Sequence, residues 1–378
     1  MRVPNPARVR GVSLIELMIA LAIGAFLMLG LVRVFSASRT AYQLSEGISR
    51  VQENGRFAID FIQRDLRMVG HMGCVNDQAH LQNAGAWRNT IPAGTAGSGV
   101  NFPLGIQAYE ATKSSATTMN LGTAAAEWTP ALPASVAALN PSAGSDVLQL
   151  RFLASEGAPV DRIVVAGATS TIEIPPARWA ALTRDGVAAP AMFGLADCSF
   201  VDYFLPAATN PAAGTVTVNT VLERYTPQPQ GQTMLYRLES VVYFVGTGAS
   251  GERALMRARS GANGVYGAAE ELVEGIESIQ VQLGLDRNAG TMPADQPSGY
   301  IGGFVRPSAM LDTEPRWRAV GAVRLGVLAS SPNRATAEQA GAGRSVLGVA
   351  FTPEDVDDTR YRFGYESTIA LRNRLYGN

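Results

Sequence analysis

The feature that most constrains this chain is an apolar run close to its N-terminus. Between residues 11 and 32 the only formally charged side chain is Glu16. About 20 consecutive apolar residues suffice to span the hydrocarbon core of a bilayer as a helix. A carboxylate at that depth costs at least ~2.5 kcal/mol even on lenient insertion scales, so its presence indicates a specific partner. We therefore predict a membrane-spanning segment in which Glu16 is a functional residue.

The residues ahead of the run are basic. Arg2, Arg8 and Arg10 lie among the first ten residues, and no acidic residue does. An excess of positive charge before a membrane span favours a cytoplasmic N-terminus. The rest of the chain is then expected on the opposite side of the membrane.

This order of parts resembles the class III signal of type IV prepilins, because a basic leader is followed by Gly11 and then by Val-Ser-Leu-Ile-Glu-Leu-Met-Ile-Ala. The resemblance implies that a prepilin peptidase cuts between Gly11 and Val12 and methylates the new amine of Val12. Glu16 then becomes the fifth residue of the mature chain. The first mature residue of that family is usually phenylalanine, and here it is valine.

Two simpler interpretations of the run remain. A secretory signal peptide has a shorter apolar region and a cleavage site between small residues, which Ser36-Ala37-Ser38 could supply. A plain signal anchor with an incidental glutamate is the other. The length of the run and the fixed spacing of Gly11 and Glu16 favour the prepilin signal over both.

The helix is expected to continue well beyond the apolar run. Apolar or small residues recur in steps of three and four, which is typical of a helix that packs one face against a partner: Leu44, Ile48, Val51, Gly55, Ala58, Ile62, Leu66 and Val69. Gly70 is a candidate C-cap. From Val12 this predicts a helix of about 58 residues, or about 87 Å at 1.5 Å per residue.

The chain is accordingly divided into four parts: a leader (1–11), a transmembrane or filament-core half of the helix (12–35), an outer half (36–70) and a globular body (71–378). Within the body, residues 72–145 are rich in Gly, Ala, Ser, Thr, Asn and Pro and are predicted to form long loops. Apolar and β-branched stretches then predict strands near residues 147–153, 163–165, 171–174, 215–218, 234–238, 241–245, 254–257, 272–286, 317–328 and 361–371. The predicted fold class is α+β, with a long N-terminal helix, the pilin-like spine, packed against an antiparallel β-sheet.

The two cysteines, Cys74 and Cys198, fall outside the cytoplasm in this arrangement, where disulfides persist. A bond between them would close a loop of about 124 residues and stabilise the fold by up to ~5 kcal/mol in the chain-entropy model. The alternative is a pair of unbonded thiols that pack as small apolar side chains.

No catalytic chemistry is indicated. The common hydrolase, zinc-protease and nucleotide-binding motifs are missing from the sequence, and His71 and His80 are its only histidines. We expect both to be ordinary surface or loop residues. The acidic residues at 354–358 lack the spacing of a calcium loop and are interpreted as a solvated turn. A net charge of -1 with no basic stripe argues against nucleic-acid binding. We therefore expect no enzyme activity, no cofactor and no metal.

Further segments resemble the PilW family of minor type IV pilins: Arg50-Val-Gln-Glu-Asn-Gly-Arg-Phe-Ala58, Gly73-Cys74, Glu271-Leu-Val-Glu-Gly-Ile-Glu277, Trp317 with Val323-Arg324, and Leu371-Arg-Asn-Arg374. The resemblance implies a minor pilin that takes part in initiation of pilus assembly and sits near the filament tip. It implies an inner-membrane anchor, a body in the periplasm and later incorporation into the surface pilus. The implied partners are other minor pilins, the major pilin, a PilY-type tip protein, the prepilin peptidase and the inner-membrane assembly platform.

Three other functions stay open at this point. A minor pseudopilin of a type II secretion system, of the J type, would share the N-terminal half, although such chains are usually much shorter. A tip adhesin would bind surfaces through the body directly. An enzyme tethered by a signal anchor is the third.

Overall fold

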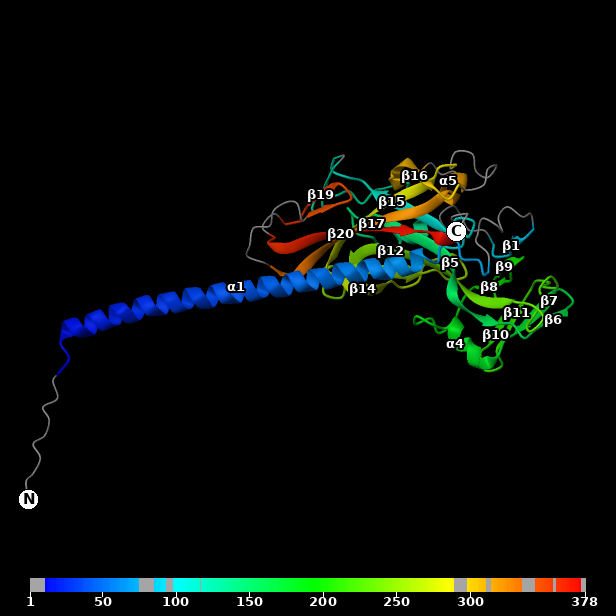
Figure 1. The fold of residues 1–378 in the computed structure, drawn as a ribbon, viewed down its shortest axis with the longest axis horizontal. Coiled ribbons are helices and arrows are strands. Elements are labelled where there is room, and N and C mark those ends of the chain that lie inside the picture. The colour runs from blue at the N-terminus through cyan, green and yellow to red at the C-terminus, as the bar shows by residue number, and fades with distance from the viewer. Residues whose placement is uncertain are drawn as a thin grey trace, which may run out of the picture.

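The computed structural model describes residues 11–74, 85–92, 98–115, 117–288, 298–310, 314–334, 344–355 and 358–374. One long helix projects from a β-rich body, and its C-terminal half packs along one side of that body (Figure 1). The predicted α+β class is confirmed. A small lobe lies at the end of the body farthest from the helix N-terminus.

Helix α1 runs over Leu14–Leu66. The predicted stripe is confirmed in its C-terminal part, where Val51, Ala58, Ile62, Leu66 and Val69 are fully buried. The C-cap, however, is Arg67 rather than Gly70. Short turns continue the chain past Leu66, and Gly70, with φ +79°, completes them.

The largest sheet has nine strands among the described residues, in the order β1-β9-β8-β12-β5-β2-β4, with β13 on β12 and β14 on β13. Its central pair, β5 and β12, is antiparallel, whereas β1 and β9 are parallel. The strands are β1 (Trp87–Asn89), β2 (Ile106–Ala111), β4 (Trp128–Thr129), β5 (Val147–Pro159), β8 (Phe193–Ala196), β9 (Val201–Phe204), β12 (Met234–Thr247), β13 (Arg253–Arg259) and β14 (Glu270–Glu274).

A second, antiparallel sheet has the order β16-β15-β17-β20 and lies against α1. Its strands are β15 (Ile276–Asp286), β16 (Ile301–Val305), β17 (Val320–Arg334) and β20 (Arg360–Ala370). A small sheet of β18 (Ser345–Val346), β19 (Val349–Thr352) and β3 (Thr118–Asn120) adjoins it. The predicted antiparallel sheet on the helix is this second sheet.

The lobe is an insertion between β5 and β12, two strands that pair directly with each other. It contains a four-stranded antiparallel sheet, β10-β11-β7-β6, and its core also includes Phe193, Leu195 and Phe204 from β8 and β9 of the largest sheet. The strands are β6 (Arg162–Ala166), β7 (Thr169–Glu173), β10 (Ala208–Asn210) and β11 (Thr215–Val218), and the short helix α4 (Trp179–Leu182) lies beside them.

The main core lies where α1 meets both large sheets. Ile62 and Leu66 of α1 pack in one cluster with Leu148 of β5, Tyr243 of β12 and Val323 of β17. Gly55 allows the closest approach, because a Cβ there would overlap the ring of Tyr365 on β20. One face of the outer half of α1 is therefore part of the core of the body, while the opposite face stays exposed.

Two sequence predictions need correction. Residues 72–145 were expected to be loops, but they include β1 to β4 and the short helix α3 (Ala134–Ala137), and every residue of β2 is buried. Tertiary pairing of β2 with β5 decides this, and local sequence carries little sign of it. The strand expected from Trp317 begins only at Val320, because Trp317 belongs to helix α5 (Glu314–Arg318).

A buried carboxylate, Asp146, joins the two large sheets. It accepts hydrogen bonds from the N–H groups of Ala111 in β2 (2.9 Å) and Val281 in β15 (2.8 Å). Burial disfavours the charged form and raises the pKa of Asp146 to about 6, although both N–H groups and the nearby Lys113 and Arg306 oppose the shift. Asp146 therefore couples the packing of the sheets to pH.

We expect the free energy of unfolding to decrease as the pH rises from about 4 to about 6. The folded state keeps a proton on Asp146 in this window, whereas the unfolded chain releases it near the ordinary pKa of 3.8. A shift of about two units corresponds to on the order of 3 kcal/mol. Urea unfolding of Asp146→Asn across this window should show a flatter pH dependence, while Asp60→Asn, at an exposed position of α1, should match the native protein. Equal pH dependence in Asp146→Asn and the native chain would contradict the assignment.

Candidate functional site

The N-terminal turn of α1 holds the one acidic residue of the apolar run. Ser13 is the N-cap, and its side chain accepts a hydrogen bond from the Glu16 N–H (3.2 Å). In return, the Glu16 carboxylate accepts bonds from the Ser13 N–H (2.9 Å) and hydroxyl (3.0 Å). This reciprocal capping box turns the carboxylate toward the start of the helix. The Glu16 carboxylate thus faces the N-terminal end of the helix, which Gly11 and Val12 immediately precede.

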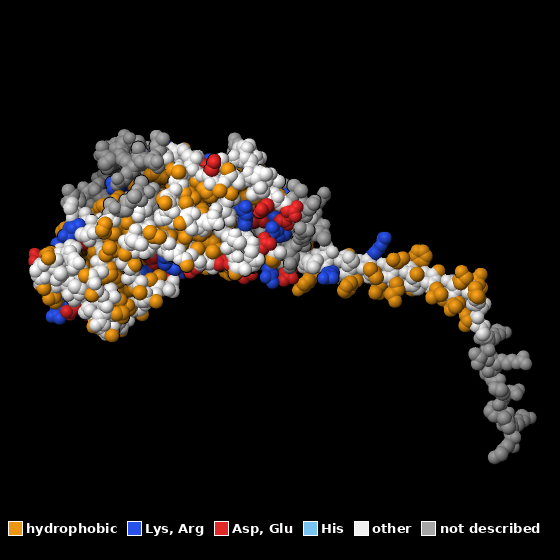
Figure 2. All heavy atoms as spheres, turned by 180° about the vertical axis from the view of Figure 1, so that it is seen from behind, with side chains coloured by type: hydrophobic (Ala, Val, Ile, Leu, Met, Phe, Trp, Pro, Cys, Tyr) orange, Lys and Arg blue, Asp and Glu red, His pale blue; other side chains and the backbone are white. Residues whose placement is uncertain are grey.

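The first half of α1 is uncovered. Every large apolar side chain from Val12 to Phe35 is at least 54 % exposed. Figure 2 shows hydrophobic side chains along the surface of the projecting helix. Among the described residues, α1 is the one helix that is long and apolar enough to cross a membrane. So large an exposed apolar surface needs lipid or protein around it.

The second half of α1 is fixed to the body by polar contacts as well as by its core. Near the helix C-terminus, Asp65 accepts a hydrogen bond from the hydroxyl of Tyr243 in β12 (2.6 Å), and Arg257 of β13 lies 3.7 Å from the same carboxylate. Burial raises the pKa of Asp65, against the opposing effects of Tyr243 and the nearby arginines. Arg64 pairs with Asp185 beside α4 at 2.7 Å. These contacts join the second half of α1 to the large sheet and to the lobe.

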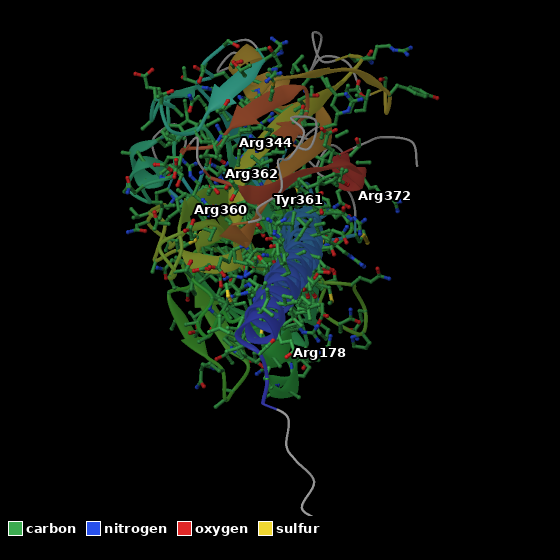
Figure 3. The ribbon with its side chains drawn as sticks, turned by 90° about the vertical axis from the view of Figure 1, so that its left-hand side faces the viewer. Arg178, Arg344, Arg360, Tyr361, Arg362 and Arg372 are labelled. Atoms are coloured by element: carbon green, nitrogen blue, oxygen red, sulfur yellow. A yellow bond between two sulfur atoms is a disulfide. The ribbon has the colours of Figure 1, made fainter. Side chains whose placement is uncertain are left out.

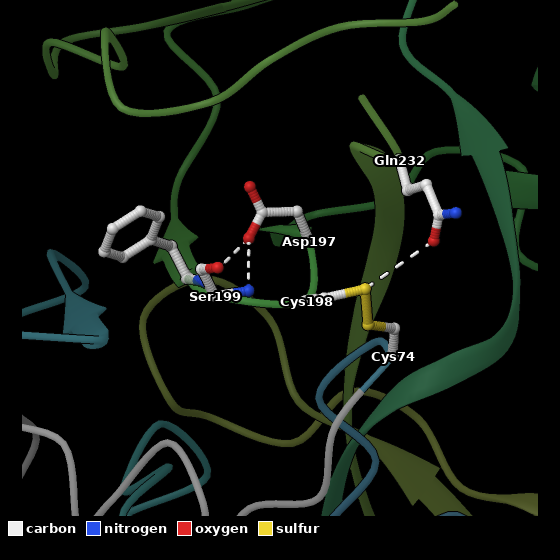
Figure 4. Close-up of a disulfide and its surroundings, with 6 residues drawn as sticks. Cys74, Asp197, Cys198, Ser199 and Gln232 are labelled. Atoms are coloured by element: carbon white, nitrogen blue, oxygen red, sulfur yellow. Dashed lines mark hydrogen bonds between the residues drawn. A yellow bond between two sulfur atoms is a disulfide. The ribbon is translucent and has the colours of Figure 1, made fainter. Parts of the chain in front are cut away.

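A disulfide joins Cys74 to Cys198, with Cα atoms 5.0 Å apart (Figure 4). Cys74 follows the turns that end α1, and Cys198 lies in the turn between β8 and β9. Asp197 fixes that turn by accepting bonds from the N–H groups of Ser199 and Phe200, both at 2.7 Å. The predicted cysteine pairing is confirmed, and it ties the end of the helix to the large sheet.

The comparisons with known proteins match two stretches of the chain. The prokaryotic N-terminal methylation motif matches residues 6–32, and the type IV pilus-assembly protein W family, PilW, matches residues 242–373. The first contains Gly11, Val12 and Glu16; the second contains the sheet that packs on α1.

The two matches support a PilW-family minor pilin. Both matched families are structural components of pili and not enzymes. Neither the comparison with curated proteins nor the comparison with solved structures found a match. The lobe between β5 and β12 lies outside both matched stretches.

The histidines and the acidic segment at 354–358 show no sign of a binding site among the described residues. His71 is half-buried, lies edge-on to Tyr236 with ring centroids 5.3 Å apart, and has a pKa lowered by burial. His80 lies outside the described residues. Asp358, from the acidic segment expected to be a solvated turn, is instead buried and ion-paired with Arg360 and Arg362. Among the described residues, no group of three His, Cys, Asp or Glu side chains is arranged to hold a metal ion.

Ser13 is the site residue that the sequence prediction missed. The signal for it was present, since Ser13 and Glu16 have the S-x-x-E spacing of a capping box ahead of an apolar run. Gly11, Val12 and Glu16 do lie together at the end of the helix, but their roles in processing and assembly stay predictions.

Loss of the disulfide should destabilise this minor pilin without changing its membrane anchor. The bond spans a sequence separation of 124 residues, and removing such a native bond typically costs about 2–5 kcal/mol. We expect Cys74→Ser, Cys198→Ser and the double variant to unfold at equally reduced urea concentrations. A single variant that kept native stability, or a double variant much weaker than either single one, would contradict this.

Proposed function

We propose that this minor pilin takes part in initiating pilus assembly and is incorporated near the filament tip, after cleavage between Gly11 and Val12. The observation that carries the proposal is the division of α1: an uncovered apolar half with Glu16 at its start, and a second half built into a folded body. The prepilin signal and the PilW match support the same function.

In this mechanism the uncovered half of α1 first anchors the processed subunit in the inner membrane, with the body in the periplasm. Transfer into the filament moves the same apolar surface from lipid into a bundle of pilin helices. The surface is never exposed to water, so the transfer avoids a large hydrophobic penalty. Other minor pilins and the major pilin supply the bundle, while the prepilin peptidase and the assembly platform act before and during extraction.

Glu16 supplies the register of assembly. Cleavage would create an amine on Val12, and a carboxylate in a low-dielectric bundle is strongly attracted to the amine of a neighbouring subunit. Each subunit would offer one acid and one amine, so assembly proceeds head to tail. A subunit at the extreme tip needs no partner above it, and Glu16 therefore favours a position beneath another pilin, close to a PilY-type tip protein.

A minor pseudopilin of a secretion system would share the N-terminal signal. The match to PilW over residues 242–373 favours the pilus, because it covers the body rather than the anchor.

Replacing Glu16 tests the assembly role. In pilus-producing cells that lack the native gene, Glu16→Ala and the nearly isosteric Glu16→Gln should both leave few surface pili, since neither can pair with an amine. Glu46→Ala, which removes an acid from the outer half of the same helix, should restore piliation. Counting pili by electron microscopy distinguishes the outcomes, and full piliation with Glu16→Ala would refute the role.

Replacing Gly11 tests processing. Gly11→Leu should accumulate as a precursor that retains residues 1–11, visible as a heavier band on a gel. Gly24→Leu, at another uncovered glycine of the same helix, should be processed normally. A product of normal size from Gly11→Leu, or N-terminal sequencing that places the cut near Ser38, would point to an ordinary signal peptide.

A further inference from the structure

Strand β20 forms an open edge of the sheet that packs on α1. Among the described strands it pairs with β17 alone. The pairing is unbroken from Ala370 opposite Ala322 to Arg362 opposite Ser330. Strand edges in monomeric proteins are usually protected by proline, charged side chains or a bulge. This stretch of β20 has no proline or bulge, and its two charged side chains are held by other residues: Arg362 pairs with Glu277, and Glu366 accepts a bond from the Leu347 N–H.

The register shows which backbone groups of β20 face outward. The Leu371 N–H donates to Gly321 O (2.8 Å), and the Ser330 N–H, opposite Arg362, donates away from β20 to Gly275 O (2.8 Å). Hydrogen-bonded and non-hydrogen-bonded pairs alternate along an antiparallel ladder. Odd-numbered residues of β20 therefore bond to β17, and the N–H and C=O groups of Gly364, Glu366, Thr368 and Ala370 point outward. No hydrogen bond from another described residue reaches these main-chain groups.

A groove lies between this edge and α1. Phe57 of α1 and Phe363 of β20 line it and are 47 % and 42 % exposed. Tyr361 and Tyr365 continue the aromatic lining, and Figure 3, which looks along α1, shows Tyr361 beside the helix. The groove is thus bounded by the last strand of the sheet on one side and by α1 on the other.

The rim of the groove carries more acid than base. Glu53 and Asp60 of α1 line it with one guanidinium, that of Arg56, which lies 3.9 Å from the Asp60 carboxylate. Glu366 of β20 also lines it, and its carboxylate accepts a hydrogen bond from the Leu347 N–H (2.6 Å). A bound segment therefore needs a basic residue. A second copy of this chain fits poorly, because pairing two β20 edges would bring two acidic rims together. Antiparallel pairing would also send the two apolar half-helices in opposite directions, which one membrane cannot accommodate.

We propose that an extended segment from the globular body of another pilin adds to β20 as the next strand of the sheet. Its backbone would bond to the outward groups of Gly364, Glu366 and Thr368. Its apolar side chains would cover Phe57 and Phe363, and a Lys or Arg would face the acidic rim. In strand addition of this kind, hydrogen bonds between main chains provide the affinity, and the side chains at every second position of the added strand provide the specificity. The proposal rests on the proposed function, because assembly along α1 brings a neighbouring pilin beside this groove.

Photo-crosslinking of the full-length chain in pilus-producing cells tests the proposal. A benzoylphenylalanine at position 363 should form an adduct with the globular body of another subunit that carries a prepilin signal, identified by mass spectrometry of the linked peptide. The same probe at Val164, an exposed position on the lobe strand β6, should not form that adduct.

Two pairs of variants show whether the strand edge is used. Thr368→Pro removes an outward N–H and leaves the bonds to β17 in place, so the adduct should fall at least about tenfold, whereas Thr368→Ala should retain it. Phe57→Glu places a further acid in the exposed groove and should also reduce the adduct, and Phe57→Leu should not. Native resistance of each variant to proteolysis, and an intact Cys74–Cys198 bond, establish that the body is folded.

The proposal is overturned by an adduct to a second copy of this chain, by the absence of an adduct to another pilin, or by an adduct that survives both Thr368→Pro and Phe57→Glu in folded protein. If these outcomes occur while surface pili still require Glu16, the groove proposal fails and the proposed function stands. If Glu16 is dispensable for pili, the proposed function itself fails.

Discussion

One half of helix α1 has to be stable outside the body and the other half inside its core, and the rest of the structure depends on this constraint. Along its first half, α1 exposes every large apolar side chain. Along its second half, residues such as Val51, Ala58 and Ile62 are completely buried between the two large sheets. Because apolar burial stabilises roughly in proportion to area, the second half holds the body together and the first remains available to lipid or to other helices.

Polar contacts also hold the second half of α1 and the two large sheets together. Asp65 binds Tyr243 at the end of α1, the disulfide holds the segment that follows, and Asp146 joins the two sheets through β2 and β15. These contacts connect the buried half of α1 to several strands instead of to a single loop.

The PilW match covers one part of the body and leaves another part outside it. The PilW match covers the sheet on α1, including the open edge of β20, whereas the lobe between β5 and β12 lies outside it. An open strand edge beside an aromatic groove offers a directional contact to a neighbour. Such a contact complements the non-directional attraction of the apolar helix, which by itself would not distinguish one pilin from another.

Helical periodicity and a lone charge in an apolar run are local signals, and they are enough to predict the helix, its buried stripe and the grouping of Gly11, Val12 and Glu16 at its start. Because the chain has two cysteines, Cys74 has one possible intramolecular partner. The sequence does not show that β2 is a buried strand within a region of loop-like composition, that the lobe is inserted between β5 and β12, or that β20 ends its sheet. These features depend on pairing between residues far apart in the chain, and strand pairing is set by the neighbours that each strand meets rather than by its own residues.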